Sequence, residues 1–333
     1  LQFMPTGWLA ACYTVICRDG TRYFLKLHPE DRPPAFAASS RAFYLPLTYQ
    51  LHHRGILPTV PAPVPNRDGA LETAWGNDVL ELTEYVQGNL VGHSGMTDEV
   101  LARLGTMIGT LHRSRSHLSI NDPLIDDFEI RFEPDLVRAL DEAPTFANHP
   151  RPGMRALGAL LRDERDRIRA HLERLHALQR RGRRLDKAKV VCHTDLHGEN
   201  LMRDTEGRLI LVDWEGAILA PPEHDLMFVA GEPRFWTVFL PKYGAAREPS
   251  FRAADLHPEV FDFYYVRRHL EDLADWIIRI REGRGTETQD REDLAEIRDC
   301  LVGLDFIPKT VRELEEGLRS QTQDSDCGRQ DAL

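Results

Sequence analysis

The sequence has no apolar run that approaches the roughly 20 residues of a membrane-spanning helix, and from its first residues we expect no signal peptide. Its five cysteines, at positions 12, 17, 192, 300 and 327, show neither CxxC pairing nor the spacing of a metal site. We therefore expect no membrane partner. Cysteines without such motifs fit a reducing cytoplasm best.

Basic charge is in deficit, because 53 Asp and Glu residues outnumber 42 Lys and Arg residues and give the 333-residue chain a net charge of -11. A nucleic-acid partner would need a basic face, so we expect none. The acidic balance favours a cationic small ligand or simply a soluble surface. The glycine-rich motif of P-loop kinases, which ends in Gly-Lys-Ser or Gly-Lys-Thr, is also absent, and its absence excludes that class by its main sign.

The most informative stretch of the chain is 190–215. An apolar run ends at His193, a polar loop follows, and a second apolar run, Leu209 to Val212, is closed by Asp213. Residues 204–207, Asp-Thr-Glu-Gly, predict a turn before the second run. This pattern predicts a strand, a loop and a hairpin that presents acidic residues at its end.

Within this stretch, His193, Asp195 and Asn200 have the spacing His-x-Asp-x-x-x-x-Asn of kinase catalytic loops. A hydroxyl that attacks a γ-phosphate needs a carboxylate to orient it and accept its proton, which suits Asp195. Mg²⁺ prefers hard oxygen ligands, which Asn200 and Asp213 would supply. Glu215, two residues beyond Asp213, would leave the same face of a continuing strand and contact the metal or the substrate.

Residues 193–200 and 211–215 resemble the paired signature of the aminoglycoside phosphotransferase and choline kinase family. Residues 219–228, Leu-Ala-Pro-Pro-Glu-His-Asp-Leu-Met-Phe, are similar to the segment that follows this signature in spectinomycin phosphotransferase-type members. The resemblance implies an α+β, bilobal, protein-kinase-like fold, with an antiparallel sheet in the N-terminal lobe and a mostly helical C-terminal lobe. It implies ATP and Mg²⁺ as cofactors, and Asp225 and His193 as structural support for the catalytic region.

The resemblance also implies a small hydroxylated substrate. The first choice is an aminoglycoside or aminocyclitol antibiotic such as spectinomycin, because residues 219–228 are most similar to that subgroup. The alternative is a metabolic kinase that acts on choline, ethanolamine, homoserine or a similar molecule.

The N-terminal part predicts a hairpin, formed by the apolar runs 8–17 and 21–27. Lys26 lies in its second strand and is the only lysine before Lys187. By the resemblance, Lys26 contacts the α- and β-phosphates, and Gly7 belongs to the loop over the phosphates, although the motif GxGxxG is absent. Segment 35–55 is the counterpart of the helix that gives this lysine a Glu partner, yet it contains no Asp or Glu.

The resemblance divides the chain into a nucleotide-binding lobe, 1–86, and a catalytic and substrate-binding lobe, 87–324. The polar residues 325–333 predict a disordered tail. The alternating run 79–86 predicts a strand that ends at the hinge between the lobes. There the backbone groups of Glu84, Tyr85 and Val86 would meet adenine.

Amphipathic patterns predict long helices over 97–118, 152–180 and 261–280. Thr97 is expected to be the N-cap of the first helix, in which Gly105 and Gly109 share a face and permit close packing.

The third helix carries a set of acids beside an aromatic residue. Glu271 and Asp275 are four residues apart and share a face, and Trp276 is four residues after Asp272. Acids next to an aromatic ring suit an amine-bearing substrate, although a solvated helix face is the simpler explanation.

Three other functions fit part of the pattern. A protein kinase is suggested by Ala220-Pro-Pro-Glu223, but this segment begins only seven residues after Asp213, and Phe-Gly does not follow that Asp. An inactive kinase-like binding module would explain the missing helix Glu and the poor glycine loop. A metal-dependent hydrolase would use His193, Asp195, His197, Asp213 and His224 as ligands.

Overall fold

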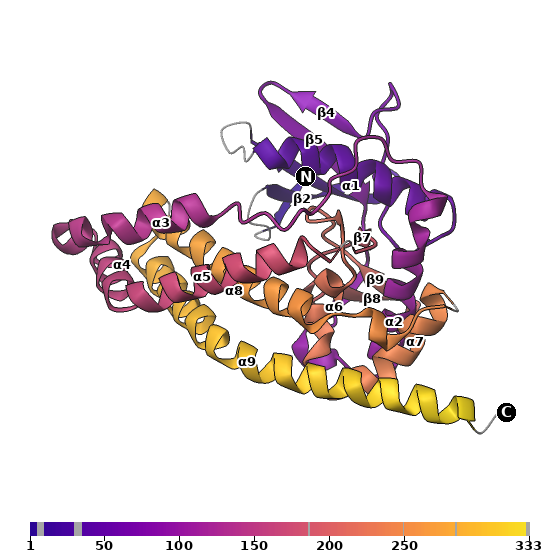
Figure 1. The fold of residues 1–333 in the computed structure, drawn as a ribbon. Coiled ribbons are helices and arrows are strands. Elements are labelled where there is room, and N and C mark those ends of the chain that lie inside the picture. Colours follow the sequence, from indigo (N-terminus) through magenta and orange to yellow (C-terminus); the bar gives the residue numbers. More distant parts are fainter. Residues whose placement is uncertain (5–9, 30–34, 186, 249, 284, 331–333) are drawn as a thin grey trace. The chain divides into compact units, whose positions relative to one another are not determined.

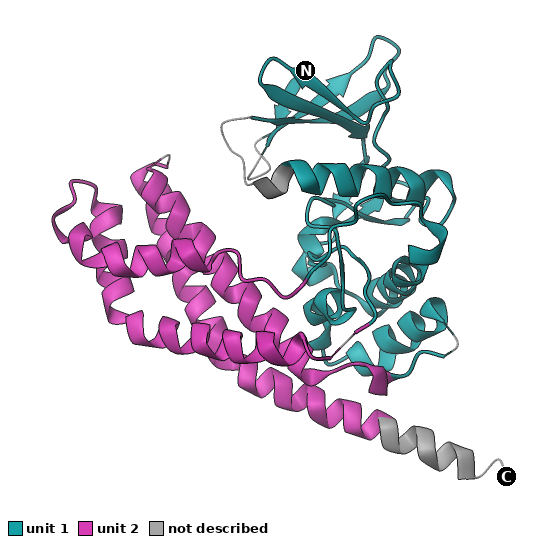
Figure 2. Cartoon of the chain, turned by 45° about the horizontal axis from the view of Figure 1, so that its top comes forward, with its two compact units in different colours: residues 1–126, 188–252 teal, residues 127–187, 253–333 magenta. Residues whose placement is uncertain are grey.

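A computed structural model describes residues 1–4, 10–29, 35–185, 187–248, 250–283 and 285–330 (Figure 1). Gly7 lies outside these residues, as do the side chains of 322–330 and the last residues of the predicted tail. The chain forms two compact units, 1–126 with 188–252 and 127–187 with 253–333 (Figure 2). The lobes predicted at 1–86 and 87–324 stay a prediction, and each unit is described by itself below.

The first unit begins with a five-stranded antiparallel sheet in the order β1-β2-β3-β5-β4. These strands are β1 (Gln2–Met4), β2 (Ala11–Ile16), β3 (Arg22–His28), β4 (Glu72–Trp75) and β5 (Asp78–Glu84). The predicted hairpin is confirmed, because β2 pairs with β3 and Gly20 takes a φ of 87° in the turn, a conformation open to glycine. In the neighbouring pair, Lys26 of β3 stands opposite Glu81 of β5.

Helix α1 (Ala35–His53) lies along this sheet (Figure 1). Phe43, Leu47 and Leu51 recur every four residues and are fully buried, so they form one apolar face. The helix carries no acidic residue in its sequence.

Two smaller antiparallel sheets carry the stretch 190–215. Strand β7 (Val190–Cys192) pairs with β10 (Ile218–Ala220), while β8 (Leu201–Asp204) lies between β6 (Gly88–Leu90) and β9 (Leu209–Leu211). The predicted turn is confirmed, because the Asp204 carboxylate accepts hydrogen bonds from the amides of Glu206 and Arg208, at 3.0 and 2.8 Å. Strands β7 and β9 are fully buried and hold the polar loop between them in place.

The helices of the first unit include α2 (Asp98–Arg113), α6 (Glu223–Ala230) and α7 (Leu240–Arg247). Its short helical turns are η1 (His93–Gly95), η2 (Ser114–His117), η4 (Gly198–Asn200) and η5 (Phe235–Phe239). Thr97 caps α2 as predicted, since its side chain accepts a hydrogen bond from the Val100 amide at 3.3 Å. A Cβ atom on Gly105 would come within 2.6 Å of the Phe239 carbonyl oxygen, and one on Gly109 would meet the Tyr243 carbonyl oxygen. The predicted close packing is thus confirmed.

We expect Gly109→Ala to lower the free energy of unfolding by about 1–3 kcal/mol, because the new methyl group forces α2 away from the α7 backbone. Alanine is by itself preferred over glycine in a helix by about 1 kcal/mol. The matched control is Thr106→Ala on the exposed face of α2, which should leave stability unchanged or raise it slightly. Urea unfolding measures both variants, and equal stability of the two would contradict the tight α2–α7 contact.

The second unit is helical. It contains α3 (Glu133–Glu142), η3 (Ala143–Asn148), α4 (Pro152–Asp163), α5 (Arg165–Gly182), η6 (Ala253–Asp255), α8 (Pro258–Glu282) and α9 (Glu287–Gln330). The prediction of one helix over 152–180 is wrong, because the chain breaks at Glu164, where φ is -98° and ψ is 3°. The break lets α4 pack on η3 while α5 packs on α8. The apolar residues predicted for one helix are thus divided between two packing contacts.

Ion pairs between partly exposed arginines and buried carboxylates join the helix ends of this unit. The Arg151 guanidinium donates two 2.9 Å hydrogen bonds to Asp290 and one to the Ile280 carbonyl, and Arg279 binds the buried carboxylate of Asp293. A Cβ atom on Gly153 would collide with Asp290, so this position requires glycine.

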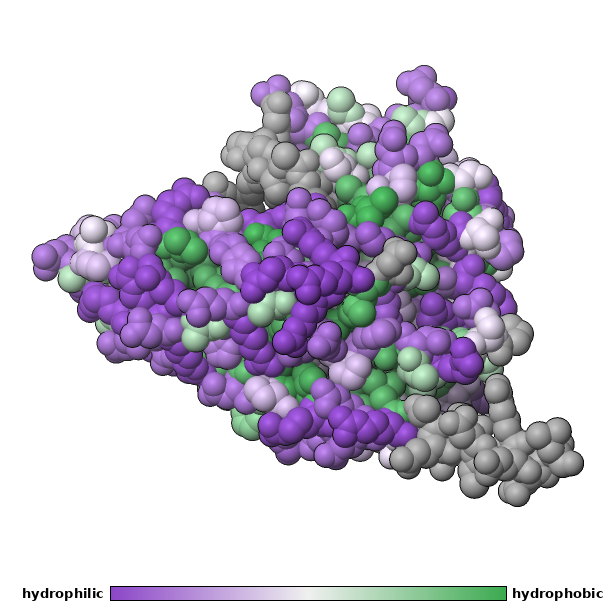
Figure 3. Space-filling model, viewed as in Figure 1, coloured by the Kyte–Doolittle hydropathy of each residue, from purple (hydrophilic) through white to green (hydrophobic). Residues whose placement is uncertain are grey.

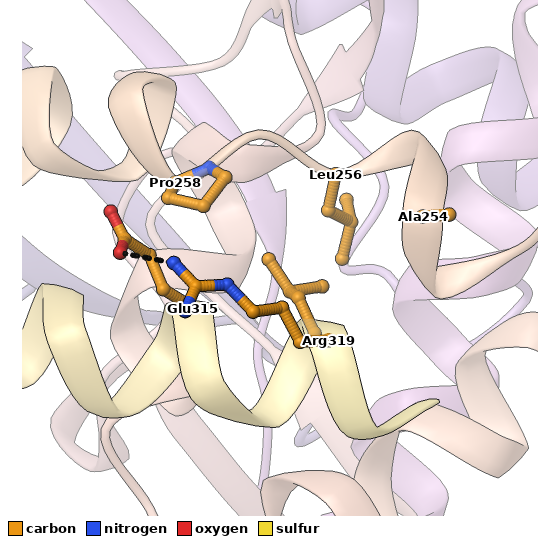
Figure 4. A pocket seen from close by; sticks show the side chains of 6 residues that line it. Ala254, Leu256, Pro258, Glu315 and Arg319 are labelled. Carbon is orange, nitrogen blue, oxygen red and sulfur yellow. Dashed lines mark hydrogen bonds and ion pairs between the residues drawn. The ribbon is translucent and has the colours of Figure 1, made fainter. Parts of the chain in front are cut away.

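A shallow cavity of about 360 Å³ lies on the surface of the second unit, near the C-terminal half of α9 (Figure 4). It is lined by Ala254, Leu256, Pro258, Glu315, Leu318 and Arg319. Glu315 and Arg319 pair with each other across one helical turn at 3.2 Å, so its charged groups are already matched.

Hydrophilic residues cover most of the face seen in Figure 3, as the charged composition leads one to expect. Among the helices that the structure describes, none combines the length and the apolar content of a membrane span.

Candidate active site

The polar loop between β7 and β8 brings Asp195 and Asn200 together. The Asn200 side-chain amide donates hydrogen bonds to the Asp195 carboxylate at 2.7 Å and to the Asp195 carbonyl at 3.0 Å. His197 lies against the same carboxylate, with Nε2 at 3.1 Å. The Asp195 side chain keeps about a quarter of its surface exposed, at 26%. The carboxylate is therefore fixed in direction, with Oδ1 buried and the side chain as a whole partly exposed.

Asp213 reaches the same place from the end of β9. The Val212 amide donates a 2.9 Å hydrogen bond to the Asn200 carbonyl, so the two chain segments lie side by side. Asp213 itself takes a φ of 64°, which turns the chain sharply at this residue, and its side chain is half exposed. An amide oxygen and a carboxylate are thus offered from adjacent backbones.

Lys26 extends from β3 to these acids. Its Nζ lies 3.0 Å from Asp213 Oδ1 and also pairs with Glu215. Burial alone would lower the pKa of Lys26, but the carboxylates of Asp213, Glu215 and Glu81 outweigh it and raise the pKa above its usual value. Lys26 is therefore a permanent cation at this site.

A buried carboxylate supports the loop from below. Asp225, at the start of α6, accepts hydrogen bonds from the backbone amides of His193 at 3.0 Å and Thr194 at 2.6 Å. Thr194 holds a φ of 75°, which is unusual for a β-branched residue, and its hydroxyl donates to the Gly216 carbonyl. The strained turn before Asp195 is thus held by contacts on both sides.

Asp225 is held in turn by a chain of hydrogen bonds that could not be predicted from the sequence. His112 Nε2 lies 2.9 Å from Asp225, and His112 Nδ1 lies 2.8 Å from the Tyr243 hydroxyl, which accepts from Arg247 at 2.9 Å. Burial lowers the pKa of His112. Burial would raise the pKa of Asp225, yet the bonds from His112 and the Thr194 amide hold it below its usual range. A neutral imidazole therefore faces an ionised carboxylate.

His193 is a structural residue of this loop in its contacts. Its Nε2 lies 3.0 Å from the Val212 carbonyl, its Nδ1 accepts from the Asp195 amide at 3.3 Å, and its ring packs edge-on against Trp214. Burial lowers the pKa of His193. Both ring nitrogens are engaged within the protein, so His193 has no atom to offer a metal ion.

The hydrolase alternative finds no support in this geometry. Among the described residues, one group of His, Cys, Asp and Glu side chains has ligand atoms close enough to hold a metal, and it consists of His112, Cys192 and Asp225. None of the five ligands predicted for a hydrolase belongs to it. Its members bond to one another or to the backbone, and the Cys192 thiol, whose pKa burial raises, donates to the Ala220 carbonyl.

The residues predicted to contact adenine lie in another part of the chain than the acids around Lys26. Glu84 ends β5, where its amide donates to the Ala62 carbonyl at 3.0 Å and its carboxylate accepts from the Ala62 amide. Tyr85 and Val86 follow β5, and the Tyr85 ring lies under the Arg22 guanidinium, 5.9 Å away.

The acids predicted for the substrate lie on α8 in the second unit. Asp272 pairs with Arg268 at 2.9 Å, and the Arg279 guanidinium stacks 4.9 Å from the Trp276 ring. Asp275 is exposed, and Glu271 is partly exposed. Of the predicted site residues, the structure thus brings together five that belong to the first unit: Lys26, Asp195, Asn200, Asp213 and Glu215.

The buried residues that hold the loop, His112, His193 and Asp225, which we call the brace, make the stability of the folded chain depend on pH. His112, His193 and Asp225 all have lowered pKa values in the folded chain, so the unfolded chain binds more protons than the folded one once the pH falls below about 6.5. We therefore expect the free energy of unfolding to decrease from pH 7.5 to pH 5.5, by up to about 1.4 kcal/mol per histidine and pH unit. Urea unfolding at several pH values measures it, and His112→Gln should show a smaller slope than the wild type.

Known proteins share this architecture. Residues 1–264 match the phosphotransferase enzyme family (APH). The protein StrN of Streptomyces griseus is 28% identical over 246 residues, which are 70% of this chain and 68% of that protein. A solved structure of spectinomycin phosphotransferase with ADP and spectinomycin aligns with a TM-score of 0.70 and 14% identity over 92% of both chains. Choline kinase LicA of Streptococcus pneumoniae aligns with a TM-score of 0.53 and 13% identity, over 92% of this chain and 94% of its own. The predicted kinase-like fold is confirmed.

Proposed function

Because this chain belongs to the phosphotransferase enzyme family, we propose that it transfers the γ-phosphoryl group of ATP to a hydroxyl of an aminoglycoside or aminocyclitol related to spectinomycin. Family membership confirms the predicted enzyme class, a phosphotransferase that acts as a small-molecule kinase. The observation that carries the proposal is the convergence of Asp195, Asn200, Asp213 and Lys26 through hydrogen bonds.

Asp195 is the proposed catalytic base. Its carboxylate is held by the Asn200 amide, so it keeps one orientation when an acceptor hydroxyl approaches. A phosphoryl transfer needs little covalent chemistry from the protein and depends mainly on positioning and charge. In this proposal Lys26 neutralises phosphate charge. The backbone groups of Tyr85 and Val86 contact adenine, together with those of Glu84 that are not bonded to Ala62.

The donor set fits a hard divalent cation. Asn200 and Asp213 offer oxygen ligands from segments that a backbone hydrogen bond holds side by side, and Mg²⁺ prefers such ligands. When bound with ATP, Mg²⁺ would neutralise charge on the phosphates. Glu215, next to Asp213 in the same acidic turn, is a further metal or substrate contact.

The proposed substrate rests on similarity and on charge. The spectinomycin phosphotransferase structure aligns over 92% of this chain, and a net charge of -11 suits an amine-bearing substrate. We propose that the acids of α8, Glu271, Asp272 and Asp275, with Trp276, contribute to binding its amines. We also expect the enzyme to act in the cytoplasm.

A metabolic substrate is the alternative that the similarity to choline kinase LicA supports. The two hypotheses differ only in the acceptor substrate, because the same catalytic groups would serve both. The experiment below distinguishes them.

The test is to incubate the protein with MgATP and, in turn, spectinomycin, other aminoglycosides, choline, ethanolamine and homoserine. Mass spectrometry then detects an added phosphate, and the Asp195→Asn variant is the matched control. We expect phosphorylation of spectinomycin or a related aminocyclitol that the variant lacks. Turnover of choline alone would favour the metabolic kinase, and MgATP binding without turnover of any acceptor would favour an inactive binding module.

A further inference from the structure

Lys26 needs a fixed negative partner, and the helix that supplies one in protein kinases has none here. In those enzymes the strand lysine pairs with a Glu of the following helix, and the pair must be formed for activity. The counterpart helix, α1, carries no Asp or Glu. We propose that Glu81 of β5 takes this role, held in place by Tyr44 of α1 and His28 of β3. This inference rests on the proposed function.

The first argument is the register of the sheet. Lys26 and Glu81 stand directly opposite each other in the antiparallel pair β3–β5, so their side chains leave the same face. Directly opposed residues have Cβ atoms about 4.5–5.5 Å apart, which is within reach for oppositely charged side chains. Glu81 also contributes to raising the pKa of Lys26.

The second argument is that Glu81 is buried and held from two elements. Its residue is only 4% exposed. The Tyr44 hydroxyl donates to its carboxylate, and His28 Nε2 lies 3.2 Å from the same oxygen. A buried carboxylate persists only when it has partners of this kind, so its position beneath Lys26 is fixed.

The third argument separates Glu81 from the other acids near Lys26. Asp213 is half exposed and Glu215 is a quarter exposed, and both are offered to a metal or a substrate in the proposed function. Glu81 has its bonds inside the fold, with Tyr44 and His28, and would keep its place opposite Lys26 when those two acids turn to a ligand.

Helix α1 therefore contributes hydroxyl groups where a carboxylate is absent. Tyr44 holds Glu81 on one side of Lys26, and the Ser40 hydroxyl, one turn earlier, donates to the Glu215 carbonyl on the other side. Two acidic residues near Lys26, Glu81 and Glu215, are thus hydrogen-bonded to the same helix. Glu81 and Tyr44 are positioning residues for Lys26 and do not touch the reacting atoms themselves.

The experiment measures nucleotide binding, which needs no acceptor. We expect Glu81→Gln to weaken the Kd for Mg·AMP-PNP about tenfold by calorimetry, and Tyr44→Phe, which keeps the carboxylate, to weaken it about threefold. The matched control is Glu72→Gln, because the half-exposed Glu72 stands opposite Glu81 on the next strand and pairs with Arg41. The control should bind like the wild type.

A double-mutant cycle shows whether the effect passes through Lys26. In a Lys26→Met background, Glu81→Gln should no longer change the Kd, and a change as large as in the wild type would overturn the proposal. A folded Glu81→Gln protein that binds within twofold of the wild type would also overturn it, as would a lowered melting temperature with normal binding. If Glu81→Gln does not fold, Tyr44→Phe decides alone. A wild-type protein that binds no nucleotide would instead contradict the proposed function.

Discussion

Replacing Asp195 with Asn is expected to lower kcat by about 10²–10⁴-fold, the range that a general base contributes. The amide cannot accept the proton of the acceptor hydroxyl, yet it occupies the same space beside Asn200. The Kd for MgADP should stay within about twofold, because the proposed function assigns the neutralisation of phosphate charge to Lys26 and not to Asp195. Steady-state kinetics and calorimetry measure the two quantities.

The control for Asp195 is Asp163→Asn, which makes the same chemical change on an exposed residue at the end of α4. It should leave both quantities unaltered. An Asp195→Asn protein with near-normal phosphoryl transfer would remove Asp195 from the mechanism, whatever the identity of the substrate.

Replacing Asp225 with Ala is expected to cost roughly 3–5 kcal/mol of unfolding free energy. The substitution leaves the amides of His193 and Thr194 and the His112 ring without their buried acceptor. Because the positive φ of Thr194 depends on that acceptor, kcat should also fall in the protein that remains folded. Urea unfolding and steady-state kinetics measure the two effects.

Two further variants test the explanation for Asp225. Asp225→Asn keeps one acceptor oxygen and should be destabilised by about half as much or less. Glu232→Gln, near the end of the same helix, breaks a surface pair with Arg234 and should change stability by less than about 1 kcal/mol. Equal losses in Asp225→Ala and Glu232→Gln would contradict the buried brace.

Much of the site could be predicted because its residues are close together in the chain. The loop from His193 to Asn200 is short, and the apolar runs that precede and follow it form the buried strands β7 and β9. The turn at 204–207 follows from the preference of Asp and Gly for tight turns. Asp213 is then delivered to Asn200 by the geometry of one hairpin.

Other parts of the molecule could not be predicted, because they depend on residues far apart in sequence. Glu81 and Tyr44 look like ordinary strand and helix residues, and only the β3–β5 register and the packing of α1 bring them to Lys26. The bond between His112 and Asp225 joins residues 113 positions apart. The helix breaks at Glu164 although no glycine or proline lies there. The break results from the packing of α4 and α5 on two different neighbours.

The sequence by itself determined the proposed chemistry of this protein, since the order and spacing of Asp195, Asn200 and Asp213 act through local backbone geometry. The tertiary structure decided what holds that chemistry in place: the acid beneath Lys26 and the brace beneath the loop. The physical reason is that a buried charge must find its partners wherever the packed fold supplies them, and a linear sequence does not record which distant residues those are.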